Sequence, residues 1–458
     1  MSSSVKSFLT AAEDVAFDIQ HRDKIKFNIG KYNSAVEKGR HRYRNIEQVK
    51  LRAGRIKRTV LNNLPLLLTQ FEKSITENGV KVYWAEDAND AVSIAVSETK
   101  KIGGKTLVKS KSMITEEIDL NESLEKQGIE SIETDLGEFI VQVAGERPYH
   151  IVTPAMHKSK EDVAELFNKH FDTPGNSTPE ELTLFVRKYL RKKFINADVG
   201  VTGANFLIAR EGAVAVTENE GNALLSASMP RLHIVIAGIE KIIPTIDDLD
   251  VFWPLLAAHG TGQQMTVYNN LFFGPRKNSE QDGPEQMVII LVNNGRTNLF
   301  KDDVARESLA CIRCGACLNS CPVYKNIGGY TYNTTYSGPI GAVITPYLKD
   351  FKEYKHLSFA SSLCGKCVEV CPVKIPLTNL LLHNRQLANN QKLTPVKERF
   401  LLSASTFVLL HRYLLDFMNG KFKTLFLGMF NEKFFGKKRK LDELPKNSFS
   451  KQWKKKRD

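Results

Sequence analysis

The chain has 458 residues, enough for two to four domains at roughly 100 to 200 residues each. Hydrophobic residues make up 42% and charged residues 25%, which excludes a small disulfide scaffold, a collagen-like chain and wholesale disorder. The net charge of +13 is concentrated in residues 21–58, with thirteen Lys and Arg against three Asp and Glu, and in residues 437–458, with ten against three. These stretches indicate either docking surfaces for an acidic partner, anionic lipid or nucleic acid, or solvated helix faces.

All seven cysteines fall between Cys311 and Cys371. Their number is odd, and residues 1–10 lack the charged start and apolar run of a secretory signal. We therefore expect a cytoplasmic protein whose clustered thiols bind metal rather than form disulfides.

Residues 1–70 are predicted to form a basic helical region that closes at the Leu64–Pro65 step, because proline restrains the residue before it. From residue 71 to 297, short β-branched or apolar runs alternate with helical stretches at 88–101 and 158–169. This pattern predicts one α/β domain built from βαβ units on a mostly parallel sheet. The expected strands are 80–84, 106–108, 139–143, 150–152, 199–202, 213–216, 232–237 and 287–292.

A polar segment at 217–222 follows an apolar strand of this domain, where open α/β sheets usually open onto a ligand crevice. Glu218 and Glu220 could act as acid–base residues or dock a partner, but solvated glutamates are the favoured interpretation. The glycine turn at 200–203 could offer its amides to a phosphate or carboxylate, although this signal is weak. No G-x-G-x-x-G fingerprint follows a strand, so no dinucleotide site is predicted, while a flavin stays an alternative. No catalytic residue is identified.

The first cysteine run has the spacing C-x2-C-x2-C-x3-C-P of bacterial ferredoxins. It consists of Cys311, Cys314, Cys317, Cys321 and Pro322. Three thiolates of such a run bind one iron–sulfur cluster, and the fourth, redirected by the proline, binds the other cluster. Zinc sites commonly pair two C-x2-C hooks and do not need this spacing, so iron–sulfur is strongly favoured over zinc.

The second run, Cys364, Cys367, Cys371 and Pro372, repeats the end of the first, with Ser361 where its first cysteine would stand. Crossed ligation predicts two clusters: cluster 1 with Cys311, Cys314, Cys317 and Cys371, and cluster 2 with Cys321, Cys364 and Cys367. Cluster 2 could be a 4Fe–4S cluster with oxygen or water on its fourth iron, a 3Fe–4S cluster, or a cluster with a ligand from elsewhere. Ligation by Ser361 is less favoured because of the high pKa of its hydroxyl.

The cysteines thus define an α-helical, ferredoxin-type module at 298–385, and a helical region with a basic tail, expected to be disordered, follows at 386–458. Residues 400–418 are rich in Leu and Phe and long enough to raise the question of a membrane span. Their charged and polar side chains fit an amphipathic helix better, either packed on the protein, as we favour, or lying at a membrane surface. The charged or titratable residues of this stretch are His411, Arg412 and Asp416.

Three segments carry a resemblance to a known family: CIRCGACLNSCPVY at 311–324, YSGPIGAV at 336–343 and LCGKCVEVCPVK at 363–374. Shorter matches extend it over nearly the whole chain, at 63–65, 84–88, 200–204, 217–222 and 274–276. The chain resembles the lactate-utilisation protein B family, including its seven cysteines and the vacant eighth place.

The resemblance implies an iron–sulfur electron-transfer subunit of a three-protein system that oxidises L-lactate to pyruvate. It also implies the seven cysteines as cluster ligands and a LUD-type α/β region related to the sugar-phosphate isomerase and coenzyme A transferase superfamily. The partners would be the other subunits and a downstream electron acceptor, with peripheral membrane contact as an option. The alternatives are a self-sufficient oxidoreductase with an organic cofactor in the α/β domain, and an iron–sulfur protein that binds nucleic acid. The latter is poorly supported, because only Tyr43 is interleaved with the arginines of 40–58.

Overall fold

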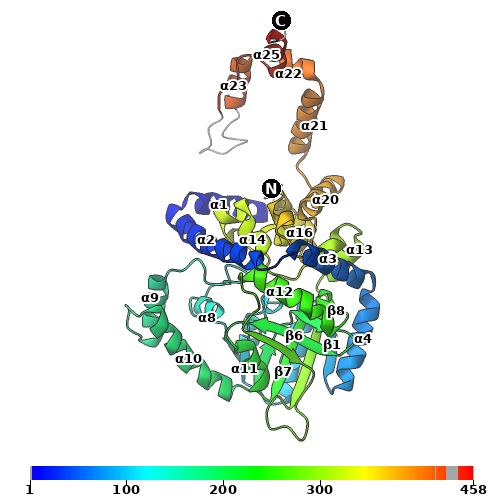
Figure 1. Cartoon of the computed structure of the whole chain (residues 1–458). Coiled ribbons are helices and arrows are strands. Elements are labelled where there is room, and N and C mark those ends of the chain that lie inside the picture. Colours follow the sequence, from blue (N-terminus) through cyan, green and yellow to red (C-terminus); the bar gives the residue numbers. More distant parts are fainter. Residues whose placement is uncertain (1–2, 418, 430–441, 457–458) are drawn as a thin grey trace. The chain divides into compact units, whose positions relative to one another are not determined.

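The computed structural model describes residues 3–417, 419–429 and 442–456, and the chain divides into two compact units at Leu387. The first unit contains a six-stranded sheet of order β1-β10-β7-β4-β2-β3 in which every neighbouring pair is parallel (Figure 1). Its strands are β1 (Lys81–Ala85), β2 (Thr106–Lys109), β3 (Glu130–Glu133), β4 (Val199–Thr202), β7 (Leu232–Gly238) and β10 (Gln286–Val292). The mostly parallel α/β sheet predicted from the sequence is confirmed.

A second sheet of order β8-β5-β6-β9 completes the α/β part of this unit. The strand β6 pairs antiparallel with both of its neighbours, and β5 pairs parallel with β8. The strands of this second sheet are β5 (Phe206–Ile208), β6 (Ala213–Glu218), β8 (Ile242–Ile243) and β9 (Tyr268–Phe272). Only β6 was expected, because the other three are two to five residues long and give little periodic signal.

In the described part of the chain, twelve helices precede or connect these strands. They are α1 (Ser3–Phe17), α2 (Ile19–His41), α3 (Ile46–Asn62), α4 (Leu64–Glu77), α5 (Ala88–Lys101), α6 (Met113–Glu117), α7 (Leu120–Glu125), α8 (Leu136–Val143), α9 (Lys160–Phe171), α10 (Pro179–Asn196), α11 (Asn222–Ser228) and α12 (Leu249–Gly260), with short 3₁₀ turns η1 (Ile239–Lys241) and η2 (Ile246–Asp248). Pro65 lies in the first turn of α4, where its missing N–H costs nothing, so it starts a new helix after α3.

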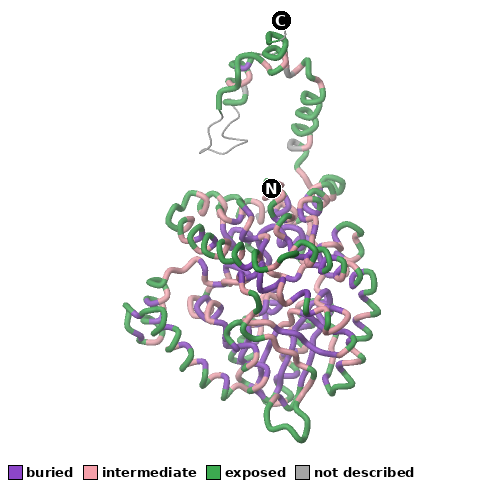
Figure 2. Tube along the Cα trace, in the orientation of Figure 1, coloured by how far each residue is buried: buried purple, intermediate pink, exposed green. Residues whose placement is uncertain are grey.

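The central strands β7 and β10 are buried on both faces (Figure 2). Ile289 and Leu291 pack in one core with Phe71 of α4, whereas Ile290 packs in another with Ala91 of α5. This alternation follows from the two-residue period of a strand. A continuous apolar run was therefore a reliable signal for these strands.

Two of the predicted strands are wrong. Residues 139–143 belong to helix α8, which starts at Asp135, whose side chain accepts a hydrogen bond from the N–H of Glu138. Residues 150–152 form no strand, because the ring Nδ1 of His150 accepts hydrogen bonds from the N–H groups of Val152 (3.0 Å) and Thr153 (3.2 Å). Short apolar runs do not distinguish helix, strand and loop by themselves.

The cysteine module is helical, as expected. Its helices are α13 (Arg296–Lys301), α14 (Ala316–Ser320), α15 (Pro322–Ile327), α16 (Gly338–Leu348), α17 (Phe351–Tyr354), α18 (His356–Phe359), α19 (Lys366–Glu369) and α20 (Leu377–Asn390), with 3₁₀ turns η3 (Ala305–Ala310) and η4 (Tyr330–Tyr332). The N-terminal helices pack against this module: α1 contacts α15 and α17, α2 contacts α14 and α15, and α3 contacts η3 (Figure 1).

The second unit, from Ala388, holds α21 (Val396–Leu410), α22 (Arg412–Phe417), α23 (Gly420–Met429) and α25 (Phe449–Lys455). A break at His411 divides the apolar stretch of 400–418, whose last residue lies outside the described part of the chain. None of the described helices is long and apolar enough to cross a membrane. The expected disorder of the basic tail is wrong for residues 449–455, which are helical, while residues 437–441 and 457–458 lie outside the described ranges.

Candidate metal centre and adjoining cavity

The two cysteine runs share one backbone conformation. Arg313 and Leu363, each directly before the second position of its run, have φ angles of 62° and 53°. Gly315 and Gly365, directly after that position, have φ angles of 78° and 83°. Residues other than glycine rarely adopt positive φ, so its repetition at matching positions indicates that the two runs share one loop shape. The helices α14 and α19, which follow the two loops, pack against each other.

Four cysteines, from both runs, line one cavity, which we call the four-cysteine cavity. They are Cys311, Cys314, Cys317 and Cys371, the first cysteine group. Burial raises the pKa of Cys317 well above its usual range, and the thiols of the other three members add to this rise. The structure thus brings together the four residues that the spacing assigns to cluster 1.

Cys321, Cys364 and Cys367 form the second cysteine group. Burial raises the pKa of Cys367 to about 11, and the nearby thiols of Cys321 and Cys364 act in the same direction. Cys321 and Cys367 are buried, whereas Cys364 is exposed. The second group therefore reaches the protein surface.

Ser361 occupies its loop as Cys311 occupies the first one. Its Oγ accepts a hydrogen bond from the N–H of Leu363 (3.2 Å), and the Sγ of Cys311 accepts one from the N–H of Arg313 (3.4 Å). The side chain of Arg385 donates to the carbonyl of Ser361 (3.0 Å) and anchors the loop. The serine hydroxyl thus has the local position that the sulfur of Cys311 has in the other run.

The donor set of the four-cysteine cavity fits an iron–sulfur cluster. Apart from Arg313, the polar residues that line it are all cysteines, and soft thiolates suit such clusters. Among the described residues, no three His, Cys, Asp or Glu side chains are arranged to hold a single metal ion. Apolar side chains line the rest of the cavity, and an apolar surrounding influences the potential of a bound cluster. They are Ile151, Ile312, Ile340, Val373, Ile375 and Leu377.

A larger cavity of about 410 Å³, the sheet-end cavity, lies beside the first cysteine group. Ser110, Gly203 and Gly238, at the carboxyl ends of β2, β4 and β7, are part of its wall. Arg313 and Cys314 line both cavities. The carboxyl ends of parallel strands are the usual place for ligands in α/β sheets, and here that place adjoins the cysteines.

The polar segment 217–222 lines the sheet-end cavity, but its glutamates are not merely solvated. Glu218 accepts hydrogen bonds from the N–H groups of Ala223 (2.7 Å) and Leu224 (2.8 Å) in the first turn of α11. These hydrogen bonds lower the pKa of Glu218, but burial has the larger effect and raises it. Glu220 accepts a hydrogen bond from the N–H of Leu136 (3.1 Å). The expectation that these glutamates are merely solvated is therefore wrong for Glu218, which stabilises the start of α11.

Gly200 does not belong to an anion-binding turn. It lies inside β4, and a Cβ at this position would come within 1.6 Å of the carbonyl oxygen of Ser226 in α11. The glycine permits close contact between strand and helix. The sequence misleads here because a strand glycine and a turn glycine look alike.

An ionic network behind the sheet-end cavity was missed. Arg296 is buried and pairs with Glu117 (2.8 Å) and Glu240 (2.6 Å), and the hydroxyl of Tyr336 donates to Glu117 (2.6 Å). The guanidinium of Arg313 lies 3.6 Å from Glu240. These residues come from distant parts of the chain, so no local motif could reveal them.

The N-terminal basic stretch is partly internal, contrary to both interpretations from the sequence. Lys50 is buried and donates to the carbonyl of Glu369 in α19 (3.0 Å). Lys57 is buried and donates to the carbonyls of Glu240 (2.7 Å) and Ile242 (3.3 Å). These two lysines tie α3 to the cysteine module and to the sheets.

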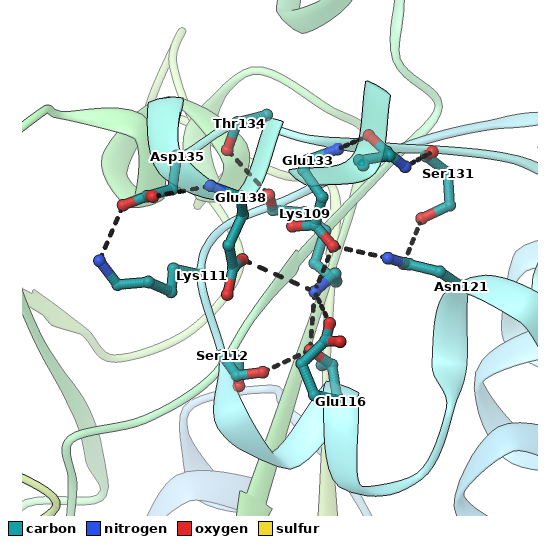
Figure 3. Close-up of polar contacts among 12 residues, drawn as sticks. Lys109, Lys111, Ser112, Glu116, Asn121, Ser131, Glu133, Thr134, Asp135 and Glu138 are labelled. Carbon is teal, nitrogen blue, oxygen red and sulfur yellow. Dashed lines mark hydrogen bonds and ion pairs between the residues drawn. The ribbon is translucent and has the colours of Figure 1, made fainter. Parts of the chain in front are cut away.

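A second polar cluster surrounds Lys109 at the end of β2 (Figure 3). This buried ammonium pairs with Glu133 (2.7 Å) and Glu116 (3.1 Å), and Glu138 lies 4.0 Å away. Burial raises the pKa of Glu138 well above its usual value, and the adjacent Glu133 adds to the rise. The cluster therefore keeps a proton at pH values where ordinary glutamates have lost theirs.

Comparison with known proteins agrees with this architecture. Residues 68–292 match the LUD domain and residues 307–375 match the 4Fe-4S dicluster domain. The chain is 43% identical over 362 residues to lactate utilization protein B of Bacillus subtilis, covering 79% of this chain and 75% of that protein. It is 44% identical over 337 residues to lactate utilization protein B 2 of Bacillus mycoides, covering 74% and 71%. It is also 41% identical over 353 residues to the uncharacterized electron transport protein YkgF of Escherichia coli, covering 77% and 74%. The chain belongs to the lactate utilization protein B family.

Proposed function

We propose that this chain is the iron–sulfur electron-transfer subunit of a multi-protein system that oxidises L-lactate to pyruvate. The observation that carries the proposal is the meeting of cysteines from both runs at the four-cysteine cavity. Relatives called lactate utilization protein B and electron transport protein support the choice of substrate and of role.

In this proposal the first cysteine group binds one cluster, and the second group binds another with only three thiolates. Iron–sulfur clusters supply one-electron transfer when they are bound. Burial raises the pKa of Cys314 and Cys317, so these thiols keep their protons in the absence of metal. They release these protons when they bind metal as thiolates. Backbone N–H groups of Arg313 and Ile375 donate to the sulfurs of Cys311 (3.4 Å) and Cys371 (3.3 Å) and hold these two ligands in orientation.

The two groups have different access to partners. Cys311, Cys314 and Cys317 of the first group are half-buried among apolar side chains and Cys371 is buried, whereas Cys364 of the second group is exposed. We therefore expect the other subunits or a downstream electron acceptor to dock around Cys364. A cytoplasmic location is part of the proposal.

Peripheral membrane contact is a secondary proposal, based on the second unit. Phe400, Leu410 and Phe417 are exposed on α21 and α22. Exposed lysines on α25, Lys451 and Lys454, could meet anionic headgroups. Binding to vesicles that contain anionic lipid, reduced by truncation after Asn390, would support this contact, and binding unaffected by the truncation would contradict it.

The decisive experiment adds L-lactate to anaerobic protein and follows cluster reduction by electron paramagnetic resonance. We expect no reduction of the chain alone and reduction when the other subunits of the system are present, with D-lactate as the control. Reduction by the chain alone, together with a yellow flavin spectrum, would favour the self-sufficient oxidoreductase. Absence of lactate-dependent reduction in the complete system would refute the proposal.

A further inference from the structure

The sheet-end cavity holds two cations with unused binding capacity. Arg313 lines it with a side chain that is only 10% exposed, and its Nη1 has no hydrogen-bond partner among the described residues. Lys241 lines the same cavity; the charge of Glu240 acts on it, but among the described residues no carboxylate lies within ion-pair distance of its ammonium. A buried guanidinium donor without an acceptor is costly, so its presence indicates that a ligand supplies one.

The acids of this cavity already have partners. Asp135 pairs with Lys111 (2.8 Å), as Figure 3 shows. Glu240 pairs with Arg296 (2.6 Å) and, through its other carboxylate oxygen, with Arg313 (3.6 Å). Glu220 accepts a hydrogen bond from the N–H of Leu136 (3.1 Å). Glu218 accepts the two amide hydrogen bonds at the start of α11 and a third from the side chain of Asn270 (3.2 Å). Unused capacity is therefore on the cationic side, which favours an anion.

The unpaired donor of Arg313 lies close to the first cysteine group. It stands between two members of the first cysteine group in the sequence and lines both cavities. Its guanidinium lies over the ring of Tyr336, 4.5 Å from the centroid, which fixes its plane. A fixed guanidinium plane suits the fork of a carboxylate.

We infer that the sheet-end cavity binds a small carboxylate anion between Arg313 and Lys241, beside the first cysteine group. The volume of about 410 Å³ is that of a small-molecule site. Glu218 and Glu220 on the same wall disfavour a dianion such as phosphate. The bound carboxylate is a second acidic partner for Arg313, in addition to Glu240, next to Cys314. This inference rests on the proposed function only in the choice of L-lactate and pyruvate as probes.

The test is anaerobic isothermal titration of the full-length protein with L-lactate, pyruvate, inorganic phosphate and the neutral lactamide. We expect L-lactate or pyruvate to bind, and lactamide and phosphate to bind at least about tenfold more weakly, the cost of a lost charge-assisted hydrogen bond. Lys241→Gln and Arg313→Gln should each weaken carboxylate binding by about tenfold or more. Lys301→Gln, which removes an exposed charge on α13, is the matched control and should change nothing.

A second measurement covers the case in which Arg313→Gln disturbs the cysteine loop. L-lactate should shift the paramagnetic resonance signal of the first site in the wild type and in Lys301→Gln, but not in Lys241→Gln. Equal binding of lactamide or phosphate, unchanged affinity in Lys241→Gln, or no binding by the wild type would overturn the inference. Calorimetry reports binding whether or not electrons flow, so its failure is distinct from failure of the proposed function.

Discussion

Arg313 and Leu363 have the same left-handed backbone conformation in the two cysteine runs, yet the two loops end in different surroundings. A Cβ on Gly315 would meet the side chain of Val152 at 3.0 Å, whereas a Cβ on Gly365 would have no neighbour within 4 Å. The first loop is thus packed against the rest of the unit, and the second is open on that side. A repeated sequence determines the shape of the loops, and the surrounding packing determines their access to solvent.

This difference suggests a division of roles. The first group, which has no fully exposed cysteine, lies beside the sheet-end cavity, where we infer a small carboxylate. The second group, with exposed Cys364, faces the outside, where a protein partner can approach. We therefore expect the two sites to differ in their ligands, in the number of thiolates, in access to a chelator and in the packing of their loops.

The largest effect is expected from exchanging the ligand that crosses between the runs. Cys371→Ser should abolish the same cluster as Cys311→Ser, because both residues line the four-cysteine cavity. Cys364→Ser is the matched variant for the other site and should spare that cluster. Electron paramagnetic resonance and iron content distinguish these outcomes. If Cys371→Ser and Cys364→Ser damage the same cluster, the crossed assignment is wrong.

The second prediction concerns the missing fourth thiolate of the second site. Ser361→Cys should convert the second site into a fully thiolate-ligated 4Fe–4S cluster and lower its potential, because an added anionic thiolate stabilises the oxidised form. Potentiometry followed by resonance spectroscopy measures both changes. Ser362→Cys, one residue further along the loop, is the control and should leave the spectrum as in the wild type. An unchanged spectrum in Ser361→Cys would show that another group already completes the site.

A smaller difference is expected in the rates at which a chelator reaches the two sites. An iron chelator should remove iron from the second site before the first, because Cys364 is exposed whereas the cysteines of the first group are half-buried or buried. The order of signal loss in resonance spectra taken during chelation checks this. Simultaneous loss from both sites would contradict the difference in enclosure.

The smallest effect concerns packing of the two glycines. Alanine at either position is strained by its positive φ, at a cost of about 1 to 2 kcal/mol. Gly315→Ala should lower Tm more than Gly365→Ala, because only the former also collides with Val152. Anaerobic thermal unfolding of the two variants measures this order. Equal decreases in Tm would mean that the loops are packed alike.

Local patterns were sufficient for the central sheet and for the cysteines. The runs at 232–237 and 287–292 are continuously apolar because β7 and β10 are buried on both faces, and the cysteine spacing is a short-range motif. Residues 139–143 show the limit of this approach. Their apolar run is helical because Asp135 caps a helix start, and the run itself does not reveal the cap.

Contacts between distant segments could not be predicted. The pairs of Arg296 with Glu117 and Glu240 join residues that no sequence motif connects. Lys50 and Lys57 belong to a basic stretch that resembles a docking surface, yet they are buried against backbone carbonyls. A charge pattern alone does not tell an internal cation from a solvated one.

The central claim is that this chain holds two iron–sulfur clusters in two different cysteine groups. Iron and sulfide analysis combined with Mössbauer spectroscopy of anaerobically purified wild-type protein tests it most directly. We expect brown protein whose visible absorption bleaches on reduction, with two spectroscopically distinct clusters per chain. Colourless protein with stoichiometric zinc, or a single cluster after full reconstitution, would contradict it.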